Sequence, residues 1–184
     1  LLYREVLFSD PEHGINQEEL MKEVLPDIIL LPGVGARSIT WQETSGPRTD
    51  TPARILFPIF ITGDLNDQML LAMGRYRWEI CRRVQGTYWN DYRVKSLTAE
   101  YYDYLQFYKK NKDLSADAKD KLKTALQHAR NNFREVFVAD YVNWIKYESQ
   151  GSFRLNKLTR DILVRYCPFS REVRTELNNN PLFQ

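Results

Sequence analysis

Two arginines and a tryptophan in the segment 75–83 are spaced so that they could bind phosphate. Arg75, Trp78 and Arg82 recur at intervals of three and four residues, which places them on one face of a helix. The guanidinium groups could hold a phosphate while the indole stacks on a base. The same side chains could instead form an arginine–glutamate pair with Glu79 inside a helical bundle. Tryptophan in a chain with 13% aromatic residues mostly packs in the core, so we favour the structural interpretation.

Two further cations follow the aromatic segment 101–108, which contains four tyrosines. Lys109 and Lys110 could extend a surface for nucleic acid or nucleotide phosphate. Positive charge at a helix C-terminus also favours the helix dipole, and this explains their position without a ligand. The aromatic residues surround the helix, so we expect more than one of its faces to be covered. Tyrosine is frequent at protein interfaces, which makes a partner surface the alternative here.

The only glycine-rich loop, Gly33 to Arg37, could hold an anion on its backbone amides, with Arg37 adding positive charge. It lacks the lysine and hydroxyl residue of a P-loop and the third glycine of the dinucleotide fingerprint. We therefore predict a tight turn between two strands. An enzyme fragment that uses this loop with an acid from Asp64 or Asp67 is a further hypothesis, and it requires a concave pocket joining these positions.

The histidines and cysteines show no spacing typical of a catalytic or metal site. His13 and His128 are the only histidines, and neither has a cysteine, histidine or paired carboxylate placed for zinc. Cys81 and Cys167 lie far apart in apolar helical patterns, so we predict buried thiols and a reducing compartment, the cytoplasm. The sequence predicts no catalytic residue, no metal and no cofactor, and we lean away from an enzyme.

Apolar residues recur at helical spacing from residue 63 onward. Asp64 is expected to cap the first of these helices, Gly86 to end it, and Thr98 to cap the next helix. Two shorter helices are predicted near the C-terminus, at 155–166 and 170–177.

The longest helical pattern opens at Ser115 and reaches about Ser149. At 1.5 Å per residue it would be roughly 50 Å long, more than a compact domain of this size spans. The pattern either breaks near Asn131-Asn132, where two weak helix formers meet, or projects as an arm.

The first 62 residues have a different pattern, in which strands and loops predominate. Proline cannot donate to a β-ladder, so we expect a strand at 54–62 to lie at a sheet edge or to break at Pro58. The other elements expected here are a helix at 17–25 capped by Asn16, a buried strand at Ile28 to Leu31, and a half-exposed strand at 38–41.

These elements predict a mainly α fold, a bundle of four to five helices with a small β element from the first 62 residues. We expect the strand-and-loop segment 1–62 to pack on a helical domain at 63–177, with a tail at 178–184. The chain starts at Leu1 and not at a methionine, and we expect one compact unit excised from a longer protein.

Charge and hydropathy limit the classes of partner. Residues 1–50 contain 4 Lys+Arg against 9 Asp+Glu, whereas residues 51–184 contain 22 against 15. This excess of positive charge is modest beside the basic stripes of dedicated nucleic-acid binders, so a nucleic-acid partner is possible but not favoured. No apolar run approaches the roughly 20 residues of a spanning helix, and we expect no membrane insertion.

Several short segments resemble poorly characterised bacterial chains over residues 26–177. They are Phe57–Phe60, Gly63–Leu65, Arg77–Arg82, Trp89–Asp91, Ser96–Tyr101 and Trp144–Ser149. In some of these chains such a region accompanies a cyclic-nucleotide-binding domain elsewhere in the same protein. Domains of that type use a phosphate cassette of glycine, glutamate and a buried arginine, which this sequence lacks. The resemblance implies an accessory region that does not itself hold the nucleotide, and no binding residue transfers from it.

The leading hypothesis is therefore a non-catalytic regulatory or protein-interaction domain of a larger bacterial protein. Its partner would be another protein or other domains of the same chain. The alternative is nucleic-acid or nucleotide-phosphate binding through the Arg/Trp helix face, for which the candidate binding residues are Arg37, Arg75, Trp78, Arg82, Lys109 and Lys110.

Overall fold

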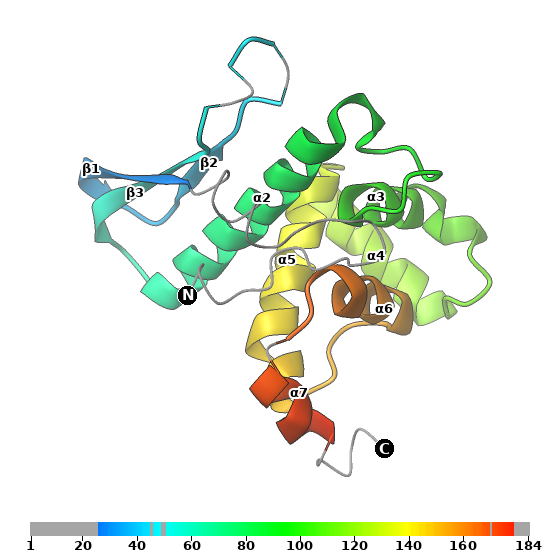
Figure 1. Ribbon diagram of the computed structural model, residues 1–184. Helices are drawn as coiled ribbons and strands as arrows, with labels where there is room; N and C mark the ends of the chain where they lie inside the picture. Colours follow the sequence, from blue (N-terminus) through cyan, green and yellow to red (C-terminus); the bar gives the residue numbers. More distant parts are fainter. Residues whose placement is uncertain (1–25, 45, 49–50, 170, 179–184) are drawn as a thin grey trace.

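The computed structural model describes residues 26–44, 46–48, 51–169 and 171–178. Within these residues the chain forms six α-helices and one three-stranded sheet, which confirms the predicted mainly α class with a small β element (Figure 1). There is one helix more than the expected four to five, because the longest predicted helix divides in two. The predicted helix at 17–25 with its cap Asn16 and the histidine His13 lie outside the described residues.

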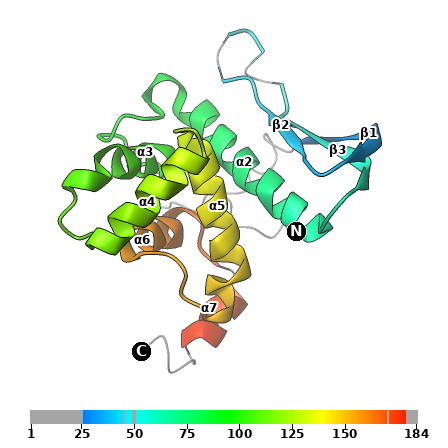
Figure 2. The same ribbon diagram turned by 180° about the vertical axis from the view of Figure 1, so that it is seen from behind.

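The helices surround a central one. They are α2 (Leu65–Gln85), α3 (Leu97–Phe107), α4 (Ala116–His128), α5 (Phe133–Lys146), α6 (Lys157–Tyr166) and α7 (Arg171–Asn178). Seen from behind, α5 lies between α2 on one side and α3, α4 and α6 on the other (Figure 2). No helix in the described part of the chain is both long and apolar enough to cross a lipid bilayer.

The sheet contains β1 (Asp27–Gly35), β2 (Ile39–Trp41) and β3 (Arg54–Ile61) in the order β1-β3-β2. Strand β1 runs parallel to β3, and β2 runs antiparallel to it. The last strand along the chain is thus the central one. The expectation that this strand would be an edge or would break at Pro58 was wrong.

Pro58 is tolerated in the central strand because of where its neighbours end. Strand β2 pairs only with Arg54 to Leu56, so Pro58 lies beyond the reach of that ladder. On the other side the register with β1 shifts directly after the pair Leu31–Pro58, where β1 bulges. The missing N–H of proline therefore interrupts little of the hydrogen bonding.

The glycines of the predicted turn belong to a strand instead. Gly33 and Gly35 lie in β1, with Gly33 at the bulge and at a φ of 155°, so the turn prediction for Gly33 to Arg37 was wrong. The strand that was expected to be buried is also exposed, since Ile28 and Leu30 are 55% and 62% exposed. This run lies in an edge strand that no layer of the described residues covers. An apolar run of this length occurs in exposed edge strands and in buried core strands alike, so the run alone does not distinguish them.

Two capping predictions for the helices were correct and one was wrong. The Asp64 carboxylate accepts a hydrogen bond from the Asp67 amide at 2.9 Å, and Gly86 ends α2 with a φ of 56°. The cap of α3 is Ser96, whose hydroxyl accepts from the Ala99 amide. Thr98 lies inside the helix, and its hydroxyl donates to the Trp89 carbonyl at 2.7 Å.

The longest pattern breaks at the two asparagines, which is one of the two alternatives that the sequence left open. Ser115 caps α4, which ends at His128, and α5 begins at Phe133. Between them Arg130 and Asn131 adopt left-handed φ values of 53° and 59°, a conformation that asparagine tolerates better than most residues. The break turns α5 back along α4.

A buried carboxylate fixes the connection between α5 and α6. Glu148 is 1% exposed and accepts hydrogen bonds from the amides of Arg154 and Leu155 and from the Arg160 guanidinium. Burial alone would raise the pKa of Glu148, but the hydrogen bonds from Arg160 and the two amides hold it below its ordinary value.

The α2–α5 crossing is close because a glycine lies on α2 at the contact. A Cβ at Gly74 would lie 3.1 Å from Cδ1 of Tyr141 and 3.4 Å from Cγ1 of Val138, both on α5. From this contact two cores extend. A small one joins the sheet to Ala72, Tyr76 and Ile80 of α2, and a large aromatic one fills the space among the helices.

A tyrosine–aspartate hydrogen bond joins α3 to α5 at the side of the aromatic core. The buried Tyr101 hydroxyl donates to the Asp140 carboxylate at 2.5 Å. Burial raises the pKa of Tyr101, which keeps this donor protonated. Burial also raises the pKa of Asp140 from 3.8 to about 6, although the hydrogen bond from Tyr101 acts in the opposite direction.

The raised pKa of Asp140 predicts how stability depends on pH. The folded protein holds this proton more tightly than the unfolded chain, so the stabilisation contributed by Asp140 is present below pH 4 and is lost as the pH rises through 6. Asp140→Asn removes the cost of ionising the carboxyl. We expect it to increase the free energy of unfolding at pH 7.5 by up to about 3 kcal/mol, with little effect below pH 4.

Urea unfolding of both proteins from pH 3.5 to pH 8 measures this effect. Asp120→Asn is the matched control, because Asp120 is exposed on α4 and should leave the profile of the unmutated protein unchanged. A constant difference between Asp140→Asn and the unmutated protein at every pH would contradict the assignment.

Candidate functional site

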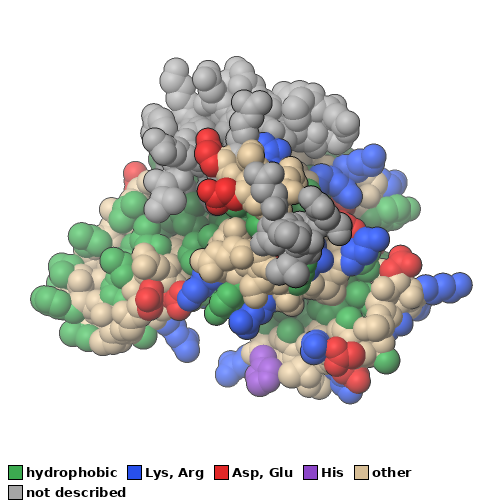
Figure 3. Space-filling model, turned by 90° about the horizontal axis from the view of Figure 1, so that it is seen from below, with side chains coloured by type: hydrophobic (Ala, Val, Ile, Leu, Met, Phe, Trp, Pro, Cys, Tyr) green, Lys and Arg blue, Asp and Glu red, His purple; other side chains and the backbone are tan. Residues whose placement is uncertain are grey.

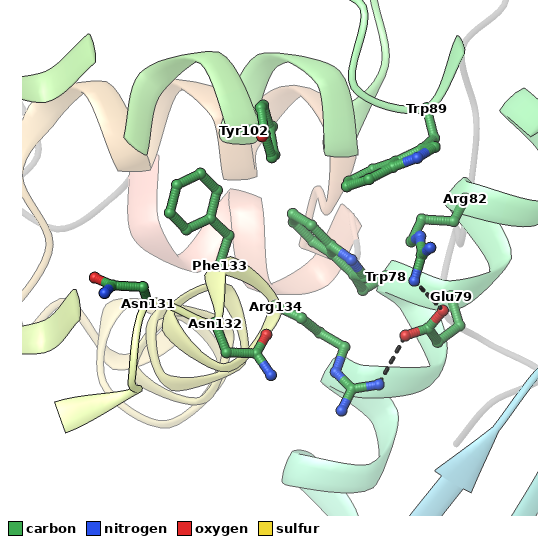
Figure 4. Close-up of a pocket in the computed structure, with 9 residues that line it drawn as sticks. All are labelled: Trp78, Glu79, Arg82, Trp89, Tyr102, Asn131, Asn132, Phe133 and Arg134. Carbon is green, nitrogen blue, oxygen red and sulfur yellow. Dashed lines mark hydrogen bonds and ion pairs between the residues drawn. The ribbon is translucent and has the colours of Figure 1, made fainter. Parts of the chain in front are cut away.

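A pocket of about 400 Å³ opens where α2, α3 and the start of α5 meet. Its walls combine four aromatic rings, three charged side chains and two amides (Figure 4). The nine residues are Trp78, Glu79, Arg82, Trp89, Tyr102, Asn131, Asn132, Phe133 and Arg134. Small-molecule sites are commonly of this size and of this mixed lining.

The four aromatic rings form one continuous wall. Trp78 and Trp89 meet edge to face with centroids 6.3 Å apart, and Trp89 meets Tyr102 in the same way at 5.4 Å. Tyr102 in turn contacts Phe133 at 4.9 Å. Trp78 is buried and fixed by the core, whereas the other three are partly exposed, so their rings can contact a ligand.

An alternating chain of charges runs beside this wall and joins α2 to α5. Arg75 makes a two-pronged contact with Glu135, which also accepts from Arg134. Arg134 then donates to Glu79 at 2.7 Å, and Glu79 accepts from Arg82 at 3.2 Å. Both carboxylates are therefore held by two arginines each.

This charge chain contains three arginines and two glutamates, which gives it a net charge of +1. Burial would raise the pKa of Glu135, but Arg75 and Arg134 hold it below its ordinary value. Burial would lower the pKa of Arg134, and its two glutamate partners keep it raised. These two shifts favour the charged forms of Glu135 and Arg134.

The first turn of α5 adds to the positive character of the pocket. Asn132 is the N-cap of α5, yet its side chain makes no capping hydrogen bond. The leading amides of the helix carry a partial positive charge, and they are left without that partner. The N–H of Arg82 at Nε is also buried and has no hydrogen-bond partner among the described residues.

Two of the six candidate binding residues line this pocket. Trp78 forms its inner wall, and Arg82 stacks on Trp89 with its guanidinium carbon 4.6 Å from the ring centroid. Arg75 is the far end of the charge chain and does not line the pocket. Lys109 and Lys110 are exposed in a 3-10 turn after α3, and Arg37 is exposed between β1 and β2.

Sequence reasoning missed most of the wall. Trp89, Tyr102 and Phe133 come from three separate segments, and nothing in their spacing indicates a common site. The one available signal was the break at Asn131-Asn132, which starts α5 at the pocket. Arg134 was missed because its partner Glu79 lies 55 residues away along the chain.

The positions of the enzyme-fragment hypothesis have other roles. Asp64 caps α2, and Asp67 accepts from the Lys146 ammonium at 2.5 Å. Among the described residues no three histidine, cysteine, aspartate or glutamate side chains are grouped as a metal site. Cys81 and Cys167 are buried and form no disulfide, as predicted, and burial raises the pKa of Cys81.

A second surface, the apolar sheet surface, lies on the other side of α2. Hydrophobic side chains gather at the end of the molecule formed by the sheet (Figure 3). Ile39 and Trp41 of β2 point outward and are each 57% exposed, while Thr40 between them is buried against α2. The exposed apolar side chains of this surface are Ile28, Ile29, Leu30, Leu31, Val34, Ile39, Trp41, Ile59 and Phe60.

Comparison with known proteins finds one family. The model of a domain of unknown function (DUF8509) matches residues 86–184, from the end of α2 through the remaining helices. No curated protein matches the chain, and no solved structure matches it. The matched region includes Trp89, Tyr102, Phe133 and Arg134 of the pocket, whereas the sheet precedes it.

The charge chain predicts a large effect from losing its buried carboxylate. Glu79→Ala leaves Arg82 and Arg134 without their shared partner, and we expect a loss of about 3 kcal/mol in the free energy of unfolding. Asp117→Ala is the control, since its ion pair with Lys121 is exposed on both sides and should contribute little. Chemical denaturation of both variants at pH 7 measures the difference, and equal losses would contradict the proposed role of Glu79.

Proposed function

The chain belongs to the family described as a domain of unknown function (DUF8509), and we propose that it is a non-catalytic regulatory or protein-interaction domain of a larger bacterial protein. In this proposal the apolar sheet surface receives an extended apolar strand of a protein partner, which pairs with the free edge of β1. One observation carries the proposal: the sheet packs on α2 with one face and exposes apolar side chains on the other face and along β1.

The backbone of β1 supports strand addition. Asp27 to Leu31 pair with β3 on one side, and no strand of the described residues pairs with the other side. Exposed edges are normally protected by lysine, proline or a bulge. Here Pro32 and the bulge protect only the second half of β1, and the first half carries no lysine or arginine. An incoming strand can therefore complete its hydrogen bonds there.

The side chains of β1 define the chemistry of the partner strand. Ile28 and Leu30 share one face with Ile55 and Phe57 of β3, but they extend beyond the cover of α2. Ile29 and Leu31 point to the outer face. Apolar residues on both faces select a strand that is apolar throughout, unlike the half-polar strand of an ordinary surface hairpin.

The size of this surface also supports a partner. Monomeric proteins rarely leave contiguous apolar patches larger than a few hundred Å² exposed, and larger ones mark interaction sites. Nine large apolar side chains on two faces of one small sheet exceed what scattered surface residues explain. Two buried free thiols suit a reducing compartment, so the proposed location is the cytoplasm.

Lysines on the edge strand β1 test the proposal. Peptides are selected from a random phage-displayed library on the immobilised chain, and their affinities are then measured for the chain and for Ile28→Lys/Leu30→Lys, which places both lysines on the proposed docking strand β1. We expect selection of extended apolar peptides whose affinity falls at least tenfold in the double variant, since two charges would be buried. Both side chains are largely exposed, so the variant should keep its melting temperature.

Hydrogen exchange locates the contact, and a matched variant controls for charge. A bound peptide should protect the amides of Asp27 to Leu31. Val164→Lys places a lysine at a comparably exposed apolar position on α6 and should bind as the unmutated chain does. Equal affinity of the peptides for the double variant, or protection elsewhere, would overturn the assignment to the sheet.

A further inference from the structure

We infer that the aromatic pocket between α2, α3 and α5 is a binding site for a small molecule that joins a planar aromatic ring to an anionic group, a phosphate or a carboxylate. The inference is independent of the proposed function, because the pocket and the apolar sheet surface share no residue. It rests on three features of the pocket: its aromatic wall, its excess positive charge and its unused hydrogen-bond donors.

The ring of the ligand is recognised by the aromatic wall. Trp89, Tyr102 and Phe133 line the pocket and are partly exposed (Figure 4). Trp89 follows the turn after α2, Tyr102 lies on α3, and Phe133 begins α5. They meet edge to face or tilted, so their faces and edges both reach the space that they surround. A planar ring can stack on one of them and meet the edge of the next, an arrangement that aromatic groups favour.

The sign of the charge excludes a cationic ligand. An aromatic wall alone could also surround an ammonium group, for which a free carboxylate would be required. Glu79 is the only carboxylate that lines the pocket, and Arg82 and Arg134 occupy both of its oxygens. Arg82 already covers one face of Trp89. A cation would therefore meet two arginines and no free carboxylate, whereas an anion would be attracted.

Donors for the anion lie at one side of the same space. Arg134 and Arg82 line it with their guanidinium groups. The amides at the start of α5 add a positive helix end, and the uncommitted side chain of Asn132 lies beside them. Guanidinium groups and helix N-termini are both typical partners of phosphate and carboxylate.

Matched pairs of compounds separate the role of the ring from the role of the charge. The full chain is titrated by calorimetry with adenosine 5′-monophosphate against adenosine, and with naphthalene-2-carboxylate against 2-naphthylmethanol. We expect at least one anion to bind at least tenfold more tightly than its neutral partner, and binding to weaken as salt is added. The pair with the larger ratio of anion to neutral affinity shows whether the pocket favours a phosphate or a carboxylate.

Substitutions at two pocket residues, Tyr102 and Arg134, place the binding in this pocket. Tyr102→Ala removes one ring of the aromatic wall and should weaken binding of the anionic compound at least tenfold. Tyr92→Ala removes an exposed tyrosine outside the pocket and should leave that affinity unchanged. Arg134→Lys keeps the positive charge but not the planar fork, and it should cause a smaller loss than Arg134→Gln. The affinity of each variant is measured well below its own melting temperature, so that every protein is folded in the assay.

Three results would overturn the inference. The first is equal affinity for the neutral and the anionic compound of each pair. The second is no detectable binding of either anion at about 5 mM. The third is unchanged affinity for the anion in a folded Tyr102→Ala variant. Failure of these titrations would leave strand binding at the sheet unaffected, and failure of the peptide selection would leave these titrations unaffected. The two proposals are therefore tested separately.

Discussion

The structure depends on the close crossing of α2 and α5. Gly74 allows the helices to approach until Tyr141 lies against the α2 backbone, and at that distance any charged side chain between them is partly removed from water. Such charges must be paired, because an isolated buried charge costs several kcal/mol. The alternating chain from Arg75 to Arg82 satisfies this requirement by giving each carboxylate two guanidinium partners. Packing and charge pairing thus constrain the same two helices.

The same crossing accounts for both candidate surfaces. Helix α2 presents Ala72, Tyr76 and Ile80 to the sheet and Trp78 to the aromatic core, so it is buried on two sides. The sheet has only this one helix to cover it among the described elements, and a single helix covers one face of β2 and β3 but not β1. On the other side, the arginine left over after both glutamates are paired makes the aromatic pocket positive.

Local rules predicted the features that local interactions decide. The cap at Asp64 and the helix end at Gly86 each depend on one side chain and its neighbours, and both were predicted from the sequence. The break at Asn131 is equally local, and the sequence offered it as one of two alternatives. The central place of β3 and the exposure of Ile28 depend on which strand pairs with which, and an apolar run carries no such information. For the same reason only two of the nine residues that line the pocket were predicted. Trp78 and Arg82 share one helix, whereas their partners Trp89 and Arg134 lie on other elements.

A continuous set of contacts joins the two surfaces, but it does not by itself couple them. Arg75 donates to the Ser38 carbonyl next to β2 at 3.5 Å and begins the charge chain whose far end, Arg82, lines the pocket. Coupling requires an element with two arrangements that both ligands bias. Helix α2 is a single capped helix that is held by packing on two sides. Glu79 and Glu135, the two carboxylates of the charge chain, are each paired with two arginines. The physical connection is therefore better understood as a rigid support, which holds the sheet and the pocket at fixed positions on opposite sides of one helix.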